Sequence, residues 1–415
     1  MIETRFKDTE VGRIPEDWTL IPIRELAKDM ADGPFGSNLK TEHYTIDKQV
    51  RIIQLGNIGD CGWLDDNTKY TTYEHAKTLS RCIATPGSIL VAKMMPAGRS
   101  VVCPSEEKQY ILGSDVVRIV PNEKLIAEYF VYQSKSDIYL SQIAANTQGS
   151  TRQRTSISKL KDIYIPFPST KSEQIRIATA LSNIDALISE LGKLIEKKRA
   201  IKQGAMQQLI TGKKRLKGFT EAWSKKKLGD VTIMNSGGTP SSKEPKYYNG
   251  SIKFLSISDM TFSGKFVKNV EKSITELGLS NSSARLFPAG TLMYAMYASL
   301  GKCSITQVET AISQAILGFV LSDKIDRDFL YYHFNFIEPI VKEMGQTGTQ
   351  SNLSKTMVEN FTILLPPIKE QRAIASVLST MDEEISALEA KRDKYIAIKQ
   401  GMMQQLLTGK IRLID

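Results

Sequence analysis

Polar side chains that could bind a polyanion recur beside glycines and prolines in two parts of the sequence. Arg and Lys suit guanine, Asn and Gln suit adenine, and phosphates accept hydrogen bonds from Lys, Arg, Ser and backbone N–H groups. Polar, glycine-rich loops on a rigid domain are natural carriers of such side chains. We therefore select loop residues as candidate nucleic-acid contacts, although each could instead serve as a surface turn or a local cap.

The candidates form two groups, one in each half of the chain. The first group is Ser37, Asn38, Lys40, Asn57, Lys93, Arg99, Arg152 and Arg154. The second group is Thr239, Ser241, Ser242, Lys243, Ser258, Tyr294, Tyr297, Lys302, Thr349, Gln350 and Asn352. The two tyrosines could equally be core aromatics beside a strand.

Motifs for catalysis are not apparent. Four cysteines without CxxC spacing and three scattered histidines make no recognisable metal site. Gly212-Lys213 lacks the upstream glycine and the following Ser or Thr of a phosphate-binding loop. The segment 365–368, Leu-Pro-Pro-Ile, lacks the amide and the aromatic of an amino-methyltransferase motif. We expect no catalytic residue, no metal and no cofactor on this chain, while scattered acids leave a weak nuclease motif open.

Composition points to a multidomain globular protein with an anionic partner. The chain has 415 residues, a formal charge of +10 and a pI near 9.2, which favours nucleic acid. Much of the excess lies between Lys197 and Lys217, where a solvated helix face is the plainer interpretation. The N-terminus lacks the apolar core of a signal peptide, and no apolar run could span a bilayer. We expect a cytoplasmic protein without a membrane partner.

The chain is organised by an internal repeat. Residues 173–216 are nearly repeated at 370–413, with a constant offset of 197. Apolar residues recur in alternating steps of three and four, which predicts two long helices in a coiled coil. The predicted coiled-coil positions are Leu181, Ile184, Ile188, Leu191 and Ile195 in the first copy, and Leu378, Met381, Ile385, Leu388 and Tyr395 in the second.

Cap signals at both ends predict a length of about 35–40 residues for each helix. Thr170 precedes Glu173 with capping-box spacing, and Gly212 and Gly409 are stop signals. Gly204 and Gly401 interrupt the pattern. They indicate either that each helix ends earlier or that two backbones approach closely there.

The predicted fold is α+β, with two similar domains separated by two long antiparallel helices. The expected divisions are 1–168, 169–216, 217–367 and 368–415. In the first domain we expect strands at 51–55, 88–92, 100–103, 116–120 and 162–165, and one helix over 127–143. A duplicated unit that packs on itself favours pseudo-two-fold symmetry. The helices would then be a spacer between two unlike domains, which suits a bipartite, asymmetric DNA site.

The residues and their order resemble the specificity subunit of a Type I restriction–modification system. The resemblance covers nearly the whole chain. It is carried by residues 12–18, 32–40, 168–174, 236–241 and 257–259 and by the repeated Gln-Gln-Leu-x-Thr-Gly-Lys at 207–213 and 404–410.

The resemblance implies a non-catalytic subunit that binds double-stranded DNA, with the two similar domains as target-recognition domains and the two helices as spacers. It also implies two modification subunits, which carry the methyltransferase chemistry, and two restriction subunits. S-adenosylmethionine, ATP and Mg²⁺ would bind to those partners. We expect partner docking near Gln207, Gln208, Gln404 and Gln405, although solubility alone also explains these side chains. A protein–protein scaffold stays open as a second class, and a flat salt dependence of binding would favour it.

Overall fold

The computed structural model describes residues 4–66, 68–146, 154–347 and 352–414. The chain forms two compact units, which we treat separately. Unit 1 contains residues 1–192 and 390–415, and unit 2 contains residues 193–389. The long helices α6 (Lys171–Ile210) and α11 (Ile368–Leu406) each contribute one half to each unit. We call the part of unit 1 before α6 head 1, and the part of unit 2 between the long helices head 2.

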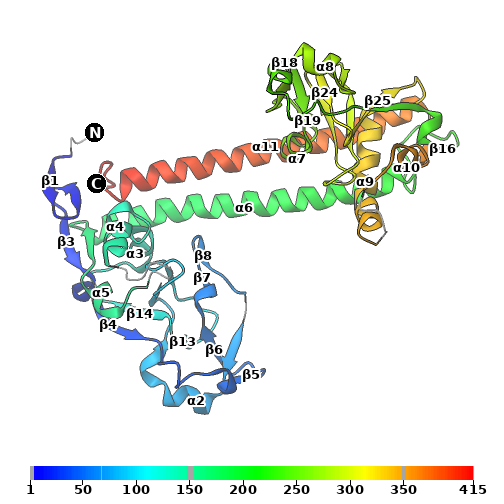
Figure 1. The fold of residues 1–415 in the computed structure, drawn as a ribbon. Helices are drawn as coiled ribbons and strands as arrows, with labels where there is room; N and C mark the ends of the chain where they lie inside the picture. Colours follow the sequence, from blue (N-terminus) through cyan, green and yellow to red (C-terminus); the bar gives the residue numbers. More distant parts are fainter. Residues whose placement is uncertain (1–3, 67, 147–153, 348–351, 415) are drawn as a thin grey trace. The chain divides into compact units, whose positions relative to one another are not determined.

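Head 1 contains two main sheets and several short helices (Figure 1). One sheet has the order β10-β13-β6-β9-β5, with β10 (Ile83–Ala84), β13 (Tyr110–Leu112), β6 (Val50–Ile53), β9 (Lys69–Thr71) and β5 (Tyr44–Thr45). The other has the order β12-β11-β14-β4, with β12 (Ser100–Val102), β11 (Ile89–Ala92), β14 (Val116–Pro121) and β4 (Ala27–Asp32). The helices are α1 (Ile23–Leu26), α2 (Tyr73–Thr78), α3 (Ala127–Gln133), α4 (Asp137–Asn146) and α5 (Ile157–Lys161). Three two-stranded pairs complete it: β1 (Phe6–Thr9) with β2 (Gly12–Pro15), β3 (Thr19–Pro22) with β15 (Tyr164–Phe167), and β7 (Ile58–Gly59) with β8 (Gly62–Trp63).

Head 2 has a similar arrangement of two sheets and short helices, with strands and helices of different lengths. Its sheets are β17-β25-β22-β23-β19 and β20-β18-β24-β21. The bounds are β17 (Thr232–Ser236), β25 (Ile316–Leu321), β22 (Leu292–Ala295), β23 (Cys303–Thr306), β19 (Phe266–Val267), β20 (Ser273–Ile274), β18 (Tyr248–Leu255), β24 (Thr310–Ile312) and β21 (Arg285–Phe287). The helices are α7 (Ile257–Ser263), α8 (Glu276–Ser280), α9 (Arg327–Thr347) and α10 (Lys355–Glu359), and β16 (Ser224–Lys227) pairs with β26 (Thr362–Leu365).

The five strands predicted for head 1 are confirmed within one or two residues, but the helix predicted over 127–143 is wrong. It is interrupted at Ser134–Ser136 and becomes α3 and α4. The Ser134 hydroxyl donates to the Val131 carbonyl, and the Ser136 hydroxyl accepts from the Tyr139 N–H. Serine hydroxyls compete in this way with helical hydrogen bonds. Head 2 has Phe334 and Phe336 at the matching positions, and α9 continues through them.

The long helices run antiparallel within each unit. In unit 1, Ile177 and Leu181 near the start of α6 share a core with Leu406 at the end of α11. In unit 2, Leu209 near the end of α6 shares a core with Leu378 near the start of α11. The helices contain 40 and 39 residues, close to the predicted length.

The predicted coiled-coil stripe is largely inward-facing. Six of its positions are buried: Leu181, Ile184, Leu191, Ile195, Leu378 and Ile385. The other four, Ile188, Met381, Leu388 and Tyr395, are half-buried. The earlier helix end at Gly204 and Gly401 is wrong, because both helices continue through these residues. Within the described part of the chain, no atom lies within 4 Å of a Cβ built on either glycine, so the two long helices do not approach closely there.

Each head is fixed to the start of the helix that follows it by a buried Glu-Gln pair, which the repeat encodes twice. In unit 1, Gln174 accepts from the Ile126 N–H and donates to the Lys124 carbonyl. In unit 2, Gln371 accepts from the Asp326 N–H and donates to the Lys324 carbonyl. Both glutamines are fully buried. The same residues in both copies therefore perform the same structural task.

An arginine from beyond the end of the other long helix closes each unit. In unit 1, Arg412 donates to Glu173 at 2.7 Å and 2.9 Å and lies over the Trp18 ring. In unit 2, Arg215 donates to Glu370 at 2.6 Å and 2.7 Å and lies over the Trp223 ring. Gly212 and Gly409, with φ of +69° and +68°, end the helices before these arginines.

Candidate nucleic-acid interface

Three loops of head 1 converge beside the sheet that contains β11: residues 33–40 after β4, the hairpin loop 93–99 between β11 and β12, and the segment that begins at Arg154. The first follows β4, where the Gly33 N–H donates to the Val116 carbonyl at 2.9 Å. A Cβ on Gly33 would lie 1.8 Å from the Gly113 carbonyl oxygen, so only glycine permits this approach. The loop containing Ser37, Asn38 and Lys40 is thereby held against residues 113–116, and all three side chains are exposed.

The second loop is the hairpin between β11 and β12. The Lys93 N–H donates to the Asp115 carbonyl, and the Thr155 N–H donates to the Lys93 carbonyl, each at 2.9 Å. These bonds hold the hairpin between residues 113–115 and the segment that begins at Arg154. Met95 at the hairpin tip has a φ of +61° and is 68% exposed. A non-glycine residue in this conformation is uncommon and costs about 1–3 kcal/mol, which the surrounding structure must offset.

Carboxylates accompany the cations of head 1 at this convergence. The pairs are Lys93 with Asp32 at 3.3 Å, Arg99 with Asp60 at 3.4 Å, and Arg154 with Asp115 at 2.6 Å. The Lys93 side chain is 8% exposed, whereas that of Arg154 is 53% exposed. Residues 1–168 contain 21 Lys and Arg and 21 Asp and Glu. Residues 1–168 therefore carry no net formal charge, and the described cations at this convergence are paired with carboxylates.

Head 2 builds the same convergence from other residues. The Gly237 N–H donates to the Ser313 carbonyl, and a Cβ there would lie 1.8 Å from the Ile312 carbonyl oxygen. The Met296 N–H donates to the Ala315 carbonyl, and the Leu353 N–H donates to the Met296 carbonyl, each at 2.9 Å. The last two bonds match those of Lys93 and Thr155 in head 1, whereas the Gly237 bond goes to the residue that corresponds to Gly113 rather than to Val116.

The tip of this second hairpin also repeats the unusual backbone of the first. Ala298 has a φ of +56°, at the position that matches Met95. Gly301 and Gly98, three residues further on, are both left-handed. The loop conformation is therefore a property of the shared frame, while its side chains are free to differ.

The side chains on this convergence in head 2 are mostly uncharged. The exposed Thr239 hydroxyl donates to the Gln314 Oε1 at 2.8 Å. Ala315 and Asn352 stand where head 1 has Asp115 and Arg154. The two heads thus present different hydrogen-bonding groups on matched scaffolds.

Neither a metal site nor a membrane span is found among the residues that the structure describes. No group of three or more His, Cys, Asp and Glu side chains there could hold a metal ion. No described helix is both long and apolar enough to cross a bilayer.

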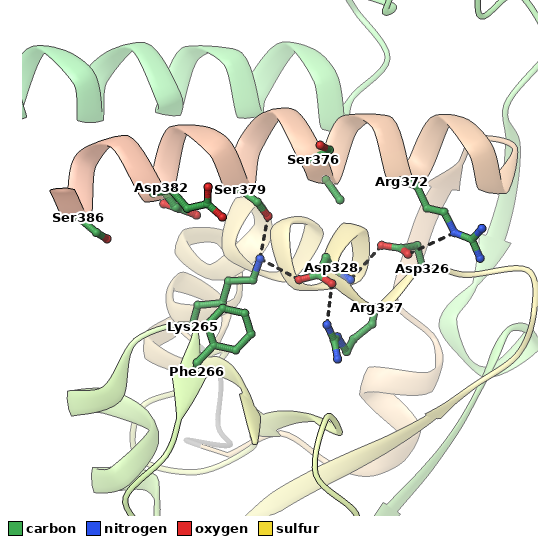
Figure 2. Close-up of a pocket in the computed structure, with 12 residues that line it drawn as sticks. Lys265, Phe266, Asp326, Arg327, Asp328, Arg372, Ser376, Ser379, Asp382 and Ser386 are labelled. Atoms are coloured by element: carbon green, nitrogen blue, oxygen red, sulfur yellow. Dashed lines mark hydrogen bonds and ion pairs between the residues drawn. The ribbon is translucent and has the colours of Figure 1, made fainter. Parts of the chain in front are cut away.

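Unit 2 has a pocket of about 540 Å³ between β19, the start of α9 and α11 (Figure 2). Lys265 fills one side of it and contacts Asp328 at 2.8 Å and Ser379 at 2.9 Å (Figure 2). Asp326 caps α9 by accepting from the N–H groups of Asp328 and Phe329. These contacts fasten head 2 to α11, so we interpret the pocket as a structural junction.

Comparison with known proteins identifies this architecture. A family model described as the Type I restriction modification DNA specificity domain matches residues 15–203 and again residues 220–397. The chain belongs to this family. Its two matched segments make it a specificity chain of the tandem kind.

Relatives match this specificity chain over nearly its whole length. The MjaVIII specificity subunit of Methanocaldococcus jannaschii is 28% identical over 99% of this chain and 97% of its own. The putative MjaX specificity subunit of the same organism is 26% identical over the same shares. The EcoKI specificity subunit of Escherichia coli is 19% identical over 97% of this chain and 90% of its own.

Solved structures share the fold at low identity. The S subunit of a Type I restriction–modification system from M. genitalium has a TM-score of 0.58 at 18% identity, covering 94% of this chain and 96% of its own. A second structure, from work on complex assembly and conformational transition of the type I R-M system, has a TM-score of 0.63 at 18% identity. It covers 96% of this specificity chain and 99% of its own.

The candidate contacts predicted from the sequence separate into three groups in this specificity chain. The exposed ones are Ser37, Asn38, Lys40, Arg154, Thr239, Ser241, Ser242, Lys243, Ser258 and Asn352. Arg99, Tyr297 and Lys302 are half-buried, and Asn57, Lys93 and Tyr294 are buried. Arg152, Thr349 and Gln350 lie outside the described residues.

Structural contacts occupy the buried candidates. The Asn57 side chain is 1% exposed, donates to the Leu64 and Asp66 carbonyls, and accepts from the Gln54 N–H. Tyr294 is fully buried with its ring 4.4 Å from that of Phe334, as expected for a core aromatic. These side chains support loops or core and face no solvent.

Sequence reasoning missed three residues at the convergence: Asp32, Asp115 and Gln314. Asp115 and Gln314 lie in short turns that precede matching strands, in the segments 112–116 and 312–316. Aligning these turns between the halves could have found them. Asp32 gave no such signal, because its pairing with Lys93 joins distant parts of the sequence.

Proposed function

We propose that this specificity chain recognises a bipartite, asymmetric site in double-stranded DNA, with each head reading one half-site. The observation that carries the proposal is the matched convergence of three loops in two heads that differ in side chains. A shared frame with variable polar groups is what two related readers of different sequences require. The antiparallel pairing of α6 and α11 suits a spacer that sets the unread gap between the half-sites.

The chain's chemistry suits a subunit that directs partners rather than one that reacts. We propose that it brings modification and restriction subunits to the site, two of each. S-adenosylmethionine, ATP and Mg²⁺ would be bound by those partners, in the cytoplasm. Gln207, Gln208 and Gln404 are exposed near the ends of α6 and α11, and Gln405 is half-buried. We propose that partners dock on the helix faces that carry these side chains.

Charge distribution predicts how this binding should respond to salt. Residues 169–216 contain 10 Lys and Arg against 4 Asp and Glu, and residues 217–367 contain 16 against 13. The first long helix and head 2 would therefore supply most phosphate contacts. Each phosphate neutralised releases counterions and steepens the fall of affinity with salt.

The test is a reconstitution. The full chain is combined with its modification subunit, and methylated DNA is sequenced. We expect methylation at one bipartite motif with a fixed gap and none when the chain is omitted. In parallel, the logarithm of affinity for that site should fall steeply with the logarithm of salt concentration. Methylation by the purified chain alone with S-adenosylmethionine, or binding insensitive to salt, would refute the proposal.

A further inference from the structure

Arg154 of head 1 and Asn352 of head 2 occupy the same place in the two heads. The residue after each one donates its backbone N–H to the start of the β-hairpin loop, Thr155 to Lys93 and Leu353 to Met296. Both side chains are exposed. The scaffold therefore presents a guanidinium in one head and an amide in the other, at matching positions beside the three converging loops.

Arg154 is held rather than free. Its backbone forms an isolated antiparallel bridge with Met94. Its Nη2 lies 2.6 Å from the Asp115 Oδ1, and the Asp115 side chain is only 25% exposed. The Asp115 carbonyl is itself fixed by the Lys93 N–H. A long side chain loses substantial rotamer entropy on binding, and this support reduces that loss by orienting the guanidinium in advance.

The acidic neighbour decides which ligand suits this arginine. A phosphate approaching Arg154 would also meet the negative charge of Asp115, which opposes binding. A guanine edge is uncharged and offers the N7 and O6 acceptors that match the guanidinium fork. The paired cytosine offers an N4 donor, which a carboxylate accepts. The Arg154–Asp115 pair is thus complementary to the major-groove edge of a G·C pair.

Head 2 lacks this charged pair. Ala315 replaces Asp115, since it accepts the equivalent bond from the Met296 N–H, and Asn352 replaces Arg154. An amide offers one donor and one acceptor, which match adenine N7 and N6 rather than guanine. The exposed Gln314 adds a second amide to the same turn. The same position is therefore suited to different bases in the two heads.

We infer that Arg154, oriented by Asp115, reads a guanine in the half-site of head 1, and that Asn352 reads an adenine at the matching place in the half-site of head 2. This inference rests on the proposed function and adds to it the base recognised by each head. Arg154 would be the base-contacting residue, and Asp115 a positioning residue that acts through it.

The experiment sequences the methylation sites of the full chain assembled with its modification subunit. Arg154→Ala should relax one G·C pair of one half-site by about 10- to 100-fold in discrimination, with the other half-site unchanged. Arg154→Gln should shift that pair toward A·T. Asp115→Asn should lower discrimination at the same pair, whereas it would raise affinity at all sites equally if Arg154 bound phosphate. Arg24→Ala is the matched control, because Arg24 is an exposed arginine that also forms an ion pair with a carboxylate, that of Asp162, and it lies on α1, outside the three converging loops.

A gain of function guards against a folding defect. The double variant Asn352→Arg with Ala315→Asp should add a guanine preference to the other half-site, which unfolding cannot imitate. If Arg154→Ala lowers methylation at all sites equally and the motif stays intact, the inference is overturned while the proposed function stands. If the unaltered assembly methylates no bipartite motif, the proposed function itself fails, and the base assignment fails with it.

Discussion

The sharpest prediction concerns Arg412, three residues before the end of the chain. Its side chain is 10% exposed and bonds to Glu173, which is 1% exposed, at the start of α6. The Nη1 atom of the same guanidinium lies 2.7 Å from the half-exposed Asp17 carboxylate, and this contact lowers the pKa of that carboxyl. The guanidinium also lies 5.6 Å from the Trp18 ring centre.

Arg412→Ala should therefore destabilise unit 1 severely. Removing one partner of a buried ion pair leaves an uncompensated charge and costs about 3–5 kcal/mol. Loss of the exposed ion pair with Asp17 adds about 0.2–1 kcal/mol to this cost. Since a domain is stable by about 5–15 kcal/mol, unit 1 would lose a large share of its stability. The double variant Arg412→Met with Glu173→Gln should recover most of the loss, because no buried charge then lacks a partner.

Hydrogen exchange read by peptide mass spectrometry can locate the effect. Arg412→Ala should speed exchange in β3, β15 and the first turns of α6. Arg215→Ala should do the same in β16, β26 and the first turns of α11. Arg392→Ala removes an arginine whose ion pair among the described residues is with the exposed Asp393, and it should change neither region. If Arg412→Ala costs less than about 1 kcal/mol, or loosens unit 2 and spares unit 1, our account of the closing arginines is wrong.

Three further predictions follow from other features. Gly204→Ala and Gly401→Ala should each stabilise the free chain by about 1 kcal/mol in chemical denaturation, because both glycines are helical with open space around them. A simultaneous fall in affinity for the modification subunit would show that this partner contacts the helix face that carries the glycine. Burial lowers the pKa of His333 from its ordinary 6.5 to about 4. As pH falls, His333 is therefore protonated in the unfolded chain before it is protonated in the folded chain. The free energy of unfolding should fall by up to about 3 kcal/mol as pH drops from 6.5 to 4. His333→Gln should remove this pH dependence of stability, measured by thermal melting at several pH values. Seven residues inserted after Leu194, with seven more after Lys391, should lengthen the unread gap by about 3 base pairs at 1.5 Å per residue and leave both half-sites unchanged in methylation sequencing; altered half-sites with an unchanged gap would contradict the spacer role.

Features that depend on local pattern were predictable from the sequence. The two long helices and their ends follow from an apolar period and glycine stop signals that are repeated at a fixed offset. The strands of head 1 follow from short β-branched runs between turn residues. In these cases neighbouring residues alone decide the outcome, because caps, turns and periodicity act over a few positions.

Features that depend on long-range burial were not predictable. Asn57 resembles a loop amide open to ligand, yet it bonds to carbonyls seven and nine residues away and is buried. Lys93 looked like a free cation, yet it faces Asp32, which is 61 residues distant. The interruption at Ser134–Ser136 depends on hydroxyl groups that could also have pointed to solvent. Which polar group becomes satisfied internally is decided by tertiary contacts, which a single sequence does not reveal.

The repeat explains why near-identical helices hold together two dissimilar heads. Each unit needs an arginine that the chain supplies from the other repeat, Arg412 for unit 1 and Arg215 for unit 2. The lysine of each mid-helix ion pair follows the same rule, with Lys399 bound to Asp185 at 2.6 Å in unit 1 and Lys202 bound to Asp382 in unit 2. Because every such pair joins residues from both copies, a substitution in one copy must match its partner in the other. These helix positions are therefore constrained by their partners, whereas the exposed side chains on the converging loops of each head carry no such constraint and are free to diverge.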